Sequence, residues 1–156
     1  MHREDFTLCN HKLSLFQAEK ADCPLFSWAT ERIHGKASFI GIAGYSLAGL
    51  FALYALYKTD VFTRVASMSG SLWFPGIKEF CKENAMKILP EKLYLSIGDK
   101  ESKTRHPILQ TMQENTEDLL KYFKSMGIET TYEVNPGNHF QDVNLRCAKG
   151  ILELLQ

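Results

Sequence analysis

Hydrophobic and polar residues follow two alternating periods from residue 38 onward. Short apolar or β-branched runs indicate buried strands, and they cover 38–43, 62–68, 92–97 and 129–134. Longer segments with apolar residues at helical spacing indicate helices, and they cover 47–58, 77–84, 108–126 and 143–155. The run at 38–43 is apolar on both faces, which is typical of a central parallel strand. Strands that alternate with helices predict an α/β fold, with a mostly parallel sheet and flanking helices.

The N-terminal part of the chain is less regular. Residues 1–22 contain two short apolar runs that do not alternate cleanly, so this segment stays unassigned. From Pro24 to about His34 the apolar spacing fits an amphipathic helix, with Pro24 in its first turn and Gly35 at its end. A length of 156 residues predicts a single domain, 1–156.

Composition narrows the class of protein. The 18 Lys and Arg residues balance the 18 Asp and Glu residues, so we expect neither nucleic acid nor an acidic membrane surface as a partner. The longest apolar run, near 47–57, is shorter than the roughly 20 residues of a membrane span. Acidic residues stand near the N-terminus where a secretion signal would be basic and then apolar, which favours a cytoplasmic protein.

The cysteines indicate neither a metal site nor a disulfide framework. Cys9, Cys23, Cys81 and Cys147 are scattered, with no C-x-x-C pair and no histidine at metal-ligand spacing. We therefore expect no bound metal, and reduced cysteines in or near the core, because the free thiol is often buried.

The stretch from residue 39 to residue 56 has the clearest chemical meaning. A buried strand runs into an apolar helix, with Ser46 at the corner and the small residues Gly44 and Ala48 on either side. This is the layout of a nucleophile elbow, a strained turn that pushes a serine hydroxyl outward. Ala48 departs from the common G-x-S-x-G pattern, but it is small. The backbone N–H of Leu47 is expected to face an oxyanion formed at Ser46.

A serine nucleophile needs a base that takes its proton and an acid that orients the base. His139 is the predicted base, because it follows the last strand in a glycine-containing loop and precedes the final helix. The acid is expected between serine and histidine in the chain, and the loop after the third strand offers Glu101 and Asp99. We prefer Glu101, three residues after Gly98, and keep Asp99 as the alternative. Ser46 and both loops follow the carboxyl ends of predicted strands, where active sites of parallel sheets lie.

Three other residues near these loops have weaker signals. Trp73 and Phe74, after the second strand, either line an acyl or alcohol pocket or pack in the core and at its rim. Asp142, just after the predicted base, fits the N-cap of the final helix.

Four stretches together give the chain a specific resemblance. They read GYSLAGLF at 44–51, SLWFPG at 71–76, SIGDKE at 96–101 and GNHF at 137–140. In this order they resemble the bacterial "putative esterase" family of the α/β-hydrolase superfamily, in particular its esterase D-like group, with enterochelin-type and feruloyl-type esterases as relatives. The resemblance covers about 24–156. It implies a serine hydrolase for small-molecule carboxylic esters, without metal or organic cofactor, and it favours Glu101 over Asp99.

The chain departs from this family at its N-terminus. A complete member has several strands before the nucleophile, and a loop among them supplies a second oxyanion donor. About 43 residues precede Gly44 here, so we expect an α/β-hydrolase fold shortened at the N-terminus, with 24–156 matching the C-terminal part of the family fold. The exposed sheet edge would then be covered either by self-association as a homo-oligomer or by residues 1–22.

Two hypotheses for function follow. In the first, the protein is a serine esterase: Ser46 attacks the ester carbonyl and forms an acyl-enzyme, His139 acts as base and then acid, and Glu101 or Asp99 orients His139. In the alternative, the protein is a truncated, catalytically weak relative that acts as an interaction or structural module. The sequence leaves the identity of the ester open, because substrate pockets are built from loops.

Overall fold

The computed structural model describes residue 31 and residues 37–156. The chain divides into two units, Met1–Ser38 and Phe39–Gln156, and all described helices and strands belong to the second. The unassigned segment 1–22 and, apart from residue 31, the helix predicted over 24–34 lie outside the described residues. The single domain over 1–156 stays a prediction.

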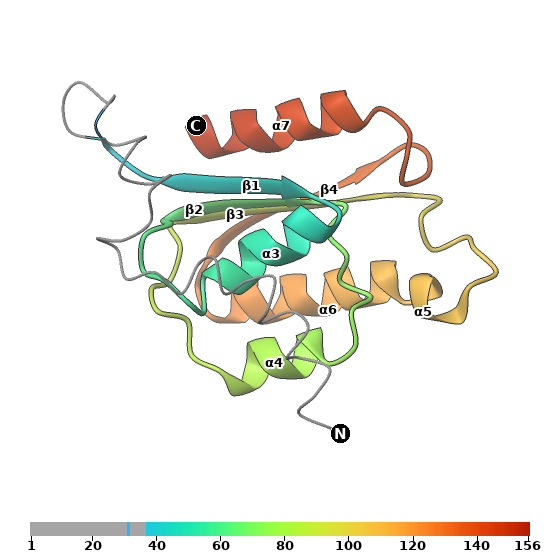
Figure 1. The fold of residues 1–156 in the computed structure, drawn as a ribbon, viewed down its shortest axis with the longest axis horizontal. Helices are drawn as coiled ribbons and strands as arrows, with labels where there is room; N and C mark the ends of the chain where they lie inside the picture. The colour runs from blue at the N-terminus through green and yellow to red at the C-terminus, as the bar shows by residue number, and fades with distance from the viewer. Residues whose placement is uncertain (1–30, 32–36) are drawn as a thin grey trace. The chain divides into compact units, whose positions relative to one another are not determined.

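Four strands form a parallel sheet in the order β1-β2-β3-β4, which confirms the predicted fold class (Figure 1). They are β1 (Gly41–Tyr45), β2 (Arg64–Met68), β3 (Lys92–Gly98) and β4 (Glu129–Asn135). Among the described residues, β1 pairs with β2 alone, so it is an edge strand here and not the central strand that its apolar composition indicates. Residues 38–43 are half-buried or exposed, so the burial that their apolar composition predicts is not found here. Apolar composition also does not specify which strand lies beside the run. The homo-oligomer expected at this edge stays a prediction.

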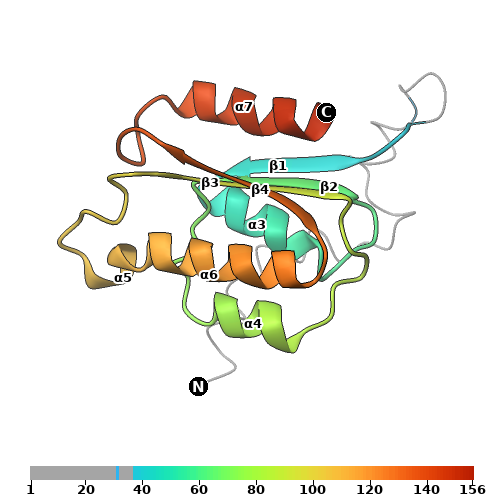
Figure 2. The same ribbon diagram turned by 180° about the vertical axis from the view of Figure 1, so that it is seen from behind.

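Five helices surround the described sheet. They are α3 (Leu47–Ala55), α4 (Ile77–Glu83), α5 (Pro107–Gln110), α6 (Met112–Ser125) and α7 (Val143–Leu155). Helices α3, α4 and α6 lie on one face of the sheet and α7 lies on the other (Figures 1 and 2). Right-handed crossovers between strands that advance in one direction place their helices on one face, and α7 returns across the opposite face after the last strand. In the part of the chain described, no helix combines the length and the hydropathy needed to cross a membrane.

The single helix predicted over 108–126 is wrong in one respect, because Thr111 separates α5 from α6. The hydroxyl of Thr111 donates to the carbonyl of Ile108 at 2.7 Å. A threonine side chain that bonds to a nearby carbonyl competes with the helical backbone pattern. Thr111 therefore ends one helix and begins the next.

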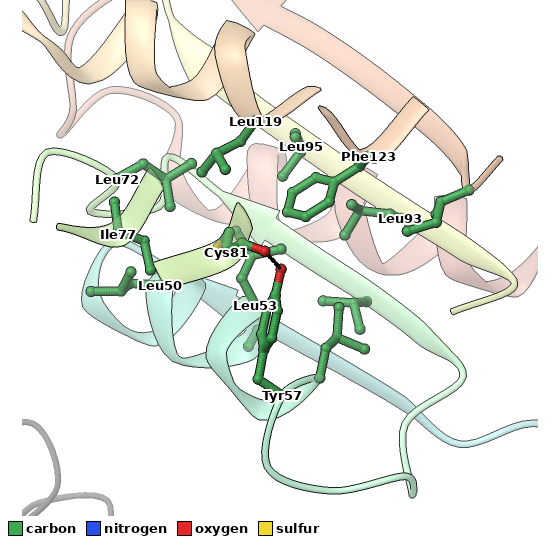
Figure 3. Close-up of a cluster of buried hydrophobic side chains, with 14 residues drawn as sticks. Leu50, Leu53, Tyr57, Leu72, Ile77, Cys81, Leu93, Leu95, Leu119 and Phe123 are labelled. Carbon is green, nitrogen blue, oxygen red and sulfur yellow. Dashed lines mark hydrogen bonds between the residues drawn. The ribbon is translucent and has the colours of Figure 1, made fainter. Parts of the chain in front are cut away.

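The larger core lies between the sheet and helices α3, α4 and α6 (Figure 3). Its buried residues include Leu50, Leu53, Leu72, Ile77, Leu93, Leu95, Leu119 and Phe123. A smaller cluster on the α7 face consists of Ala66, Met68, Tyr94 and Leu154. Because side chains alternate along a strand, Leu93 and Leu95 belong to the larger core while Tyr94 belongs to the cluster on the α7 face. Cys81 is buried in the larger core and Cys147 is half-buried, and both are free thiols.

Helix α7 has the bounds that the sequence predicts, but it turns an unexpected face to the sheet. The residues that it buries are Arg146, Gly150 and Leu154, four positions apart. A Cβ atom at Gly150 would overlap the side chain of Met68, so glycine there permits close packing of the helix on the sheet. Large apolar residues on its other faces are exposed, namely Leu145, Ile151, Leu152 and Leu155. The apolar spacing thus predicts the helix but not its buried side.

Candidate active site

Ser46 lies between β1 and α3 in a strained backbone conformation, with φ 57° and ψ −121°. For a residue other than glycine such a conformation costs about 1–3 kcal/mol, so its surroundings must impose it. The backbone N–H of Ser46 donates to the carbonyl of Met68 at 3.0 Å. Its carbonyl accepts from the N–H groups of Leu50 at 3.1 Å and Ser71 at 3.0 Å. These bonds connect the turn to the end of β2 and to the loop that follows β2.

The small residues around Ser46 have a steric role. A Cβ at Gly44 would overlap the backbone carbonyl of Ala48. A Cβ at Gly49 would lie 2.9 Å from the Cα of Gly70 and 2.9 Å from the hydroxyl of Ser67. The glycine required on the helical side is therefore Gly49, one position after Ala48.

The side chains of Ser46, His139 and Glu101 form a continuous hydrogen-bonded chain. The Ser46 Oγ lies 3.0 Å from His139 Nε2, and His139 Nδ1 lies 2.7 Å from Glu101 Oε2. With Glu101 ionised, Nδ1 carries the ring proton and donates it, which leaves Nε2 free to accept from the serine hydroxyl. These three residues come from the ends of β1, β4 and β3, so the parallel topology brings them to one edge of the sheet.

Glu101 is a fully buried carboxylate with a partner on each oxygen. Its side chain is 0% exposed, and Oε1 accepts from the Ser69 hydroxyl at 2.7 Å, the Gly98 N–H at 2.7 Å and Arg146 Nη1 at 2.9 Å. Burial by itself raises the pKa of Glu101, but the hydrogen bonds from His139, Ser69 and Gly98 outweigh it and place the pKa below its ordinary value. The carboxylate is therefore ionised at neutral pH and fixed in orientation.

Asp99, the alternative acid, contacts a different group. Its Oδ1 accepts from the backbone N–H of Gly137 at 2.7 Å, and its own N–H donates to the carbonyl of Asn135 at 2.8 Å. The N–H of Lys100 also donates to the carbonyl of Gly137, at 3.1 Å. Asp99 thus connects the loop after β3 to the loop that carries the histidine, while the contact to the imidazole comes from Glu101.

The remaining predicted residues are placed as follows. Leu47 begins α3, so its backbone N–H belongs to the first helical turn, where N–H groups lack intrahelical acceptors. Phe74 is half-buried and packs against the larger core, and Trp73 is half-buried beside it, with ring centroids 6.5 Å apart. Asp142 occupies the N-cap of α7 in the left-handed region, but its side chain makes no capping bond.

Among the described residues, four that the sequence does not mark as functional contact Ser46, His139 or Glu101. The Ser71 hydroxyl lies 3.5 Å from Ser46 Oγ, and the Tyr45 hydroxyl donates to the carbonyl of His139 at 2.8 Å. Ser69 and Arg146 both bond to the acid. No local signal marks Arg146, because the face that it shares with Gly150 and Leu154 is less apolar than the faces that α7 leaves exposed. Across residue 31 and residues 37–156, no group of three His, Cys, Asp or Glu side chains forms a candidate metal site.

Comparison with known proteins places this geometry in context. The model of a family described as "Putative esterase" matches residues 16–142. A curated protein, the uncharacterized protein YbbA of Bacillus subtilis, is 28% identical over 88 residues, which are 56% of this chain and 35% of its own length.

Several solved esterases share the fold. The enterochelin esterase of Shigella flexneri superposes with a TM-score of 0.68 at 21% identity, over 88% of this chain and 36% of that one. The enterobactin esterase FES of the same organism gives 0.62 at 22% identity, over 90% and 36%. A ferulic acid esterase gives 0.63 at 14% identity, over 87% and 58%. The chain therefore spans about a third of the length of YbbA and of the two Shigella proteins.

Proposed function

The chain belongs to the putative esterase family, and from this premise we propose that it is a serine hydrolase of small-molecule carboxylic esters. The observation that carries the proposal is the hydrogen-bonded chain from Ser46 through His139 to Glu101. A serine hydroxyl, an imidazole and a buried carboxylate in this order form the arrangement that activates a serine for acyl transfer.

The first half of the reaction forms an acyl-enzyme. Ser46 Oγ attacks the ester carbonyl while His139 Nε2 takes the hydroxyl proton, and the new imidazolium is stabilised by the anionic Glu101. The carbonyl oxygen becomes an oxyanion, which the backbone N–H of Leu47 stabilises at the start of α3. When the tetrahedral intermediate collapses, the C–O bond of the leaving alcohol breaks and His139 returns the proton to that oxygen.

The second half regenerates the serine. His139 takes a proton from water as the water oxygen attacks the acyl carbonyl, and the proton then passes to Ser46 Oγ as the carboxylic acid leaves. The strained turn at Ser46 supports this role, because backbone strain of this kind persists where the fold imposes it and is frequent at active sites. The partly exposed Trp73 is proposed to line the substrate site, while Phe74, beside it, packs against the larger core.

Hydrolysis of p-nitrophenyl butyrate and labelling by a fluorophosphonate probe test the proposal. Wild-type protein is expected to show both, and Ser46→Ala is expected to lose both. Ser125→Ala is the matched control, because Ser125 is an exposed serine at the end of α6 whose hydroxyl bonds to the carbonyl of Tyr122. Hydrolysis and labelling that persist unchanged in Ser46→Ala would show that the assignment is wrong.

A further inference from the structure

Arg146 is a buried cation at the centre of the site. It lies near the start of α7, the helix on the face of the sheet opposite α3 (Figure 1), and its side chain is 1% exposed. A buried charge is costly unless it is paired and hydrogen-bonded, so the contacts of this guanidinium must compensate for the loss of water.

These contacts reach the segments that carry all three proposed catalytic residues. Nη1 donates to Glu101 Oε1 at 2.9 Å, with the Tyr45 hydroxyl at 3.2 Å and the Ser69 hydroxyl at 3.3 Å. Nη2 donates to the carbonyl of Pro136 at 2.9 Å. Tyr45 precedes the nucleophile, and Pro136 lies in the loop of the base. A planar guanidinium with several donors is suited to bridge such groups at fixed separations, which lysine is not.

Tyr45 extends this network to the base itself. Its hydroxyl accepts from Arg146 and donates to the carbonyl of His139 at 2.8 Å. The Tyr45 ring also lies beside the imidazole, with centroids 5.3 Å apart and planes at 48°. Arg146 is therefore connected to His139 by two hydrogen-bonded routes, through Glu101 and through Tyr45.

The charges around Glu101 define what the arginine does electrostatically. Among the described residues, two ionisable groups face the carboxylate, His139 from the loop after β4 and Arg146 from α7, while Ser69 and Gly98 offer neutral donors. The neighbouring Asp99 carboxylate bonds instead to the N–H of Gly137. When the imidazole is neutral, Arg146 is therefore the cation that compensates Glu101, and an arginine does not lose its proton in a protein.

We propose that Arg146 is a positioning residue of the active site, with Tyr45 as its link to His139. It compensates the charge of Glu101, holds Oε2 directed at the imidazole, and sets the separation of the loops that carry acid and base. The inference rests on the proposed hydrolase function, because that function gives this geometry its task.

The test compares Arg146→Met, Arg146→Lys and the control Arg64→Met in the full chain, with p-nitrophenyl butyrate as substrate. Arg64 also contacts α7, since its Nη1 donates to the carbonyl of Leu154, but it lies at the start of β2, away from Glu101. Misplacing a catalytic group by about 1 Å costs about 10²-fold in rate, so Arg146→Met should lower kcat/KM by about 10²-fold, while Arg64→Met should leave it unchanged.

The pH profile separates positioning from simple destabilisation. Activity depends on an anionic Glu101, and proton uptake at this buried site becomes easier once the neighbouring cation is gone. The acid limb should therefore move to higher pH in Arg146→Met. Arg146→Lys restores the charge but not the bridge to Pro136. Its acid limb should therefore lie at the wild-type pH, while its kcat/KM should lie between those of wild type and Arg146→Met.

Any of three results would overturn the proposal. One is an acid limb that stays at the wild-type pH in a folded Arg146→Met, with activity that falls only as the folded fraction falls. If Arg146→Met does not fold, Tyr45→Phe decides: it removes one hydroxyl and should lower kcat/KM, and unchanged activity would overturn the proposed link.

A third readout does not need turnover. The Nδ1 proton of His139, bonded to Glu101, should give a far-downfield NMR signal that persists in Arg64→Met and shifts or disappears in Arg146→Met. If wild-type protein neither hydrolyses esters nor reacts with the probe, the proposed function fails, and this signal still decides on Arg146. An unchanged signal in Arg146→Met would reject the positioning role.

Discussion

Replacing Glu101 with glutamine would exchange one oxygen for an NH2 group inside a fully buried site. The structure determines the orientation of the new amide. Oε1 accepts from three donors, those of Ser69, Gly98 and Arg146, whereas Oε2 faces His139 Nδ1. An NH2 group in the place of Oε1 would face three donors. The amide oxygen must therefore occupy the place of Oε1, and the NH2 group must face the imidazole.

This orientation has a direct consequence for the base. Nδ1 of His139 must then accept a hydrogen bond, so the ring proton moves to Nε2, the atom that lies 3.0 Å from Ser46 Oγ. A protonated Nε2 cannot take the serine proton. An acid-to-amide substitution that imposes this wrong tautomer lowers kcat about 10⁴-fold. At about 1.36 kcal/mol for each factor of ten, the transition state loses about 5.4 kcal/mol.

The same substitution also affects stability, and the assay must separate the two effects. Arg146 loses its buried counter-charge, and breaking a buried ion pair destabilises by about 3–5 kcal/mol. Activity towards p-nitrophenyl butyrate should therefore be measured below the thermal midpoint of Glu101→Gln and normalised to the folded fraction from circular dichroism.

Asp99→Asn is the matched control, because it makes the same chemical change two residues away. The asparagine side chain would retain an oxygen for the N–H of Gly137, so the kcat of this variant should stay within a few-fold of wild type. A folded Glu101→Gln that keeps more than about a tenth of wild-type kcat would refute the tautomer argument. A larger loss in Asp99→Asn than in Glu101→Gln would show that the acid has been misassigned.

Three further predictions concern the fold and its pH dependence. Gly44→Ala should prevent folding, because its Cβ would overlap a carbonyl in the first turn of α3, whereas Gly41→Ala, with neighbours at 3.4 Å, should melt near the wild-type temperature. Leu119→Ala, at 0% exposure, should lower the free energy of unfolding by about 2–5 kcal/mol in urea titrations; Leu155→Ala, at 63% exposure, should change it by less than about 0.5 kcal/mol. Because the folded-state pKa of Glu101 is lowered from 4.5, its contribution to stability is present above that pH and is lost as pH falls through the folded pKa. The urea concentration at the unfolding midpoint should accordingly be lower at acid pH than at neutral pH, and this decrease should be smaller in Glu101→Gln.

Much of the architecture could be predicted from local pattern. The alternation of apolar strands and helices predicted the parallel sheet, and the bounds of α7 agree with its helical spacing. Such patterns work because burial of one face selects residues at a regular period. They failed at Thr111, where one hydroxyl interrupts a helix, and at β1, where apolar composition says nothing about which strand lies alongside.

The candidate site could be predicted to the extent that topology determines it. Parallel strands end at one edge of the sheet, so Ser46, Glu101 and His139 were expected to meet, and their side chains form a hydrogen-bonded chain. The choice between Glu101 and Asp99 could not be made from spacing alone, because both follow the same strand. In the structure, the carboxylate of Asp99 accepts from the backbone N–H of Gly137, whereas the carboxylate of Glu101 contacts the imidazole of His139.

By itself, then, the sequence determined the succession of strands and helices, because these follow from short-range periods. It also determined which residue types lie at the carboxyl ends of the strands, where small residues mark the turn at Ser46. Only the tertiary structure decided which face α7 buries, and hence that Arg146 reaches Glu101 from across the sheet. The two residues are separated by 45 positions, and no local pattern encodes a contact between a helix and a loop at that distance. The contact forms because the fold buries both side chains next to each other, away from water, and a buried charge is costly unless an opposite charge pairs with it.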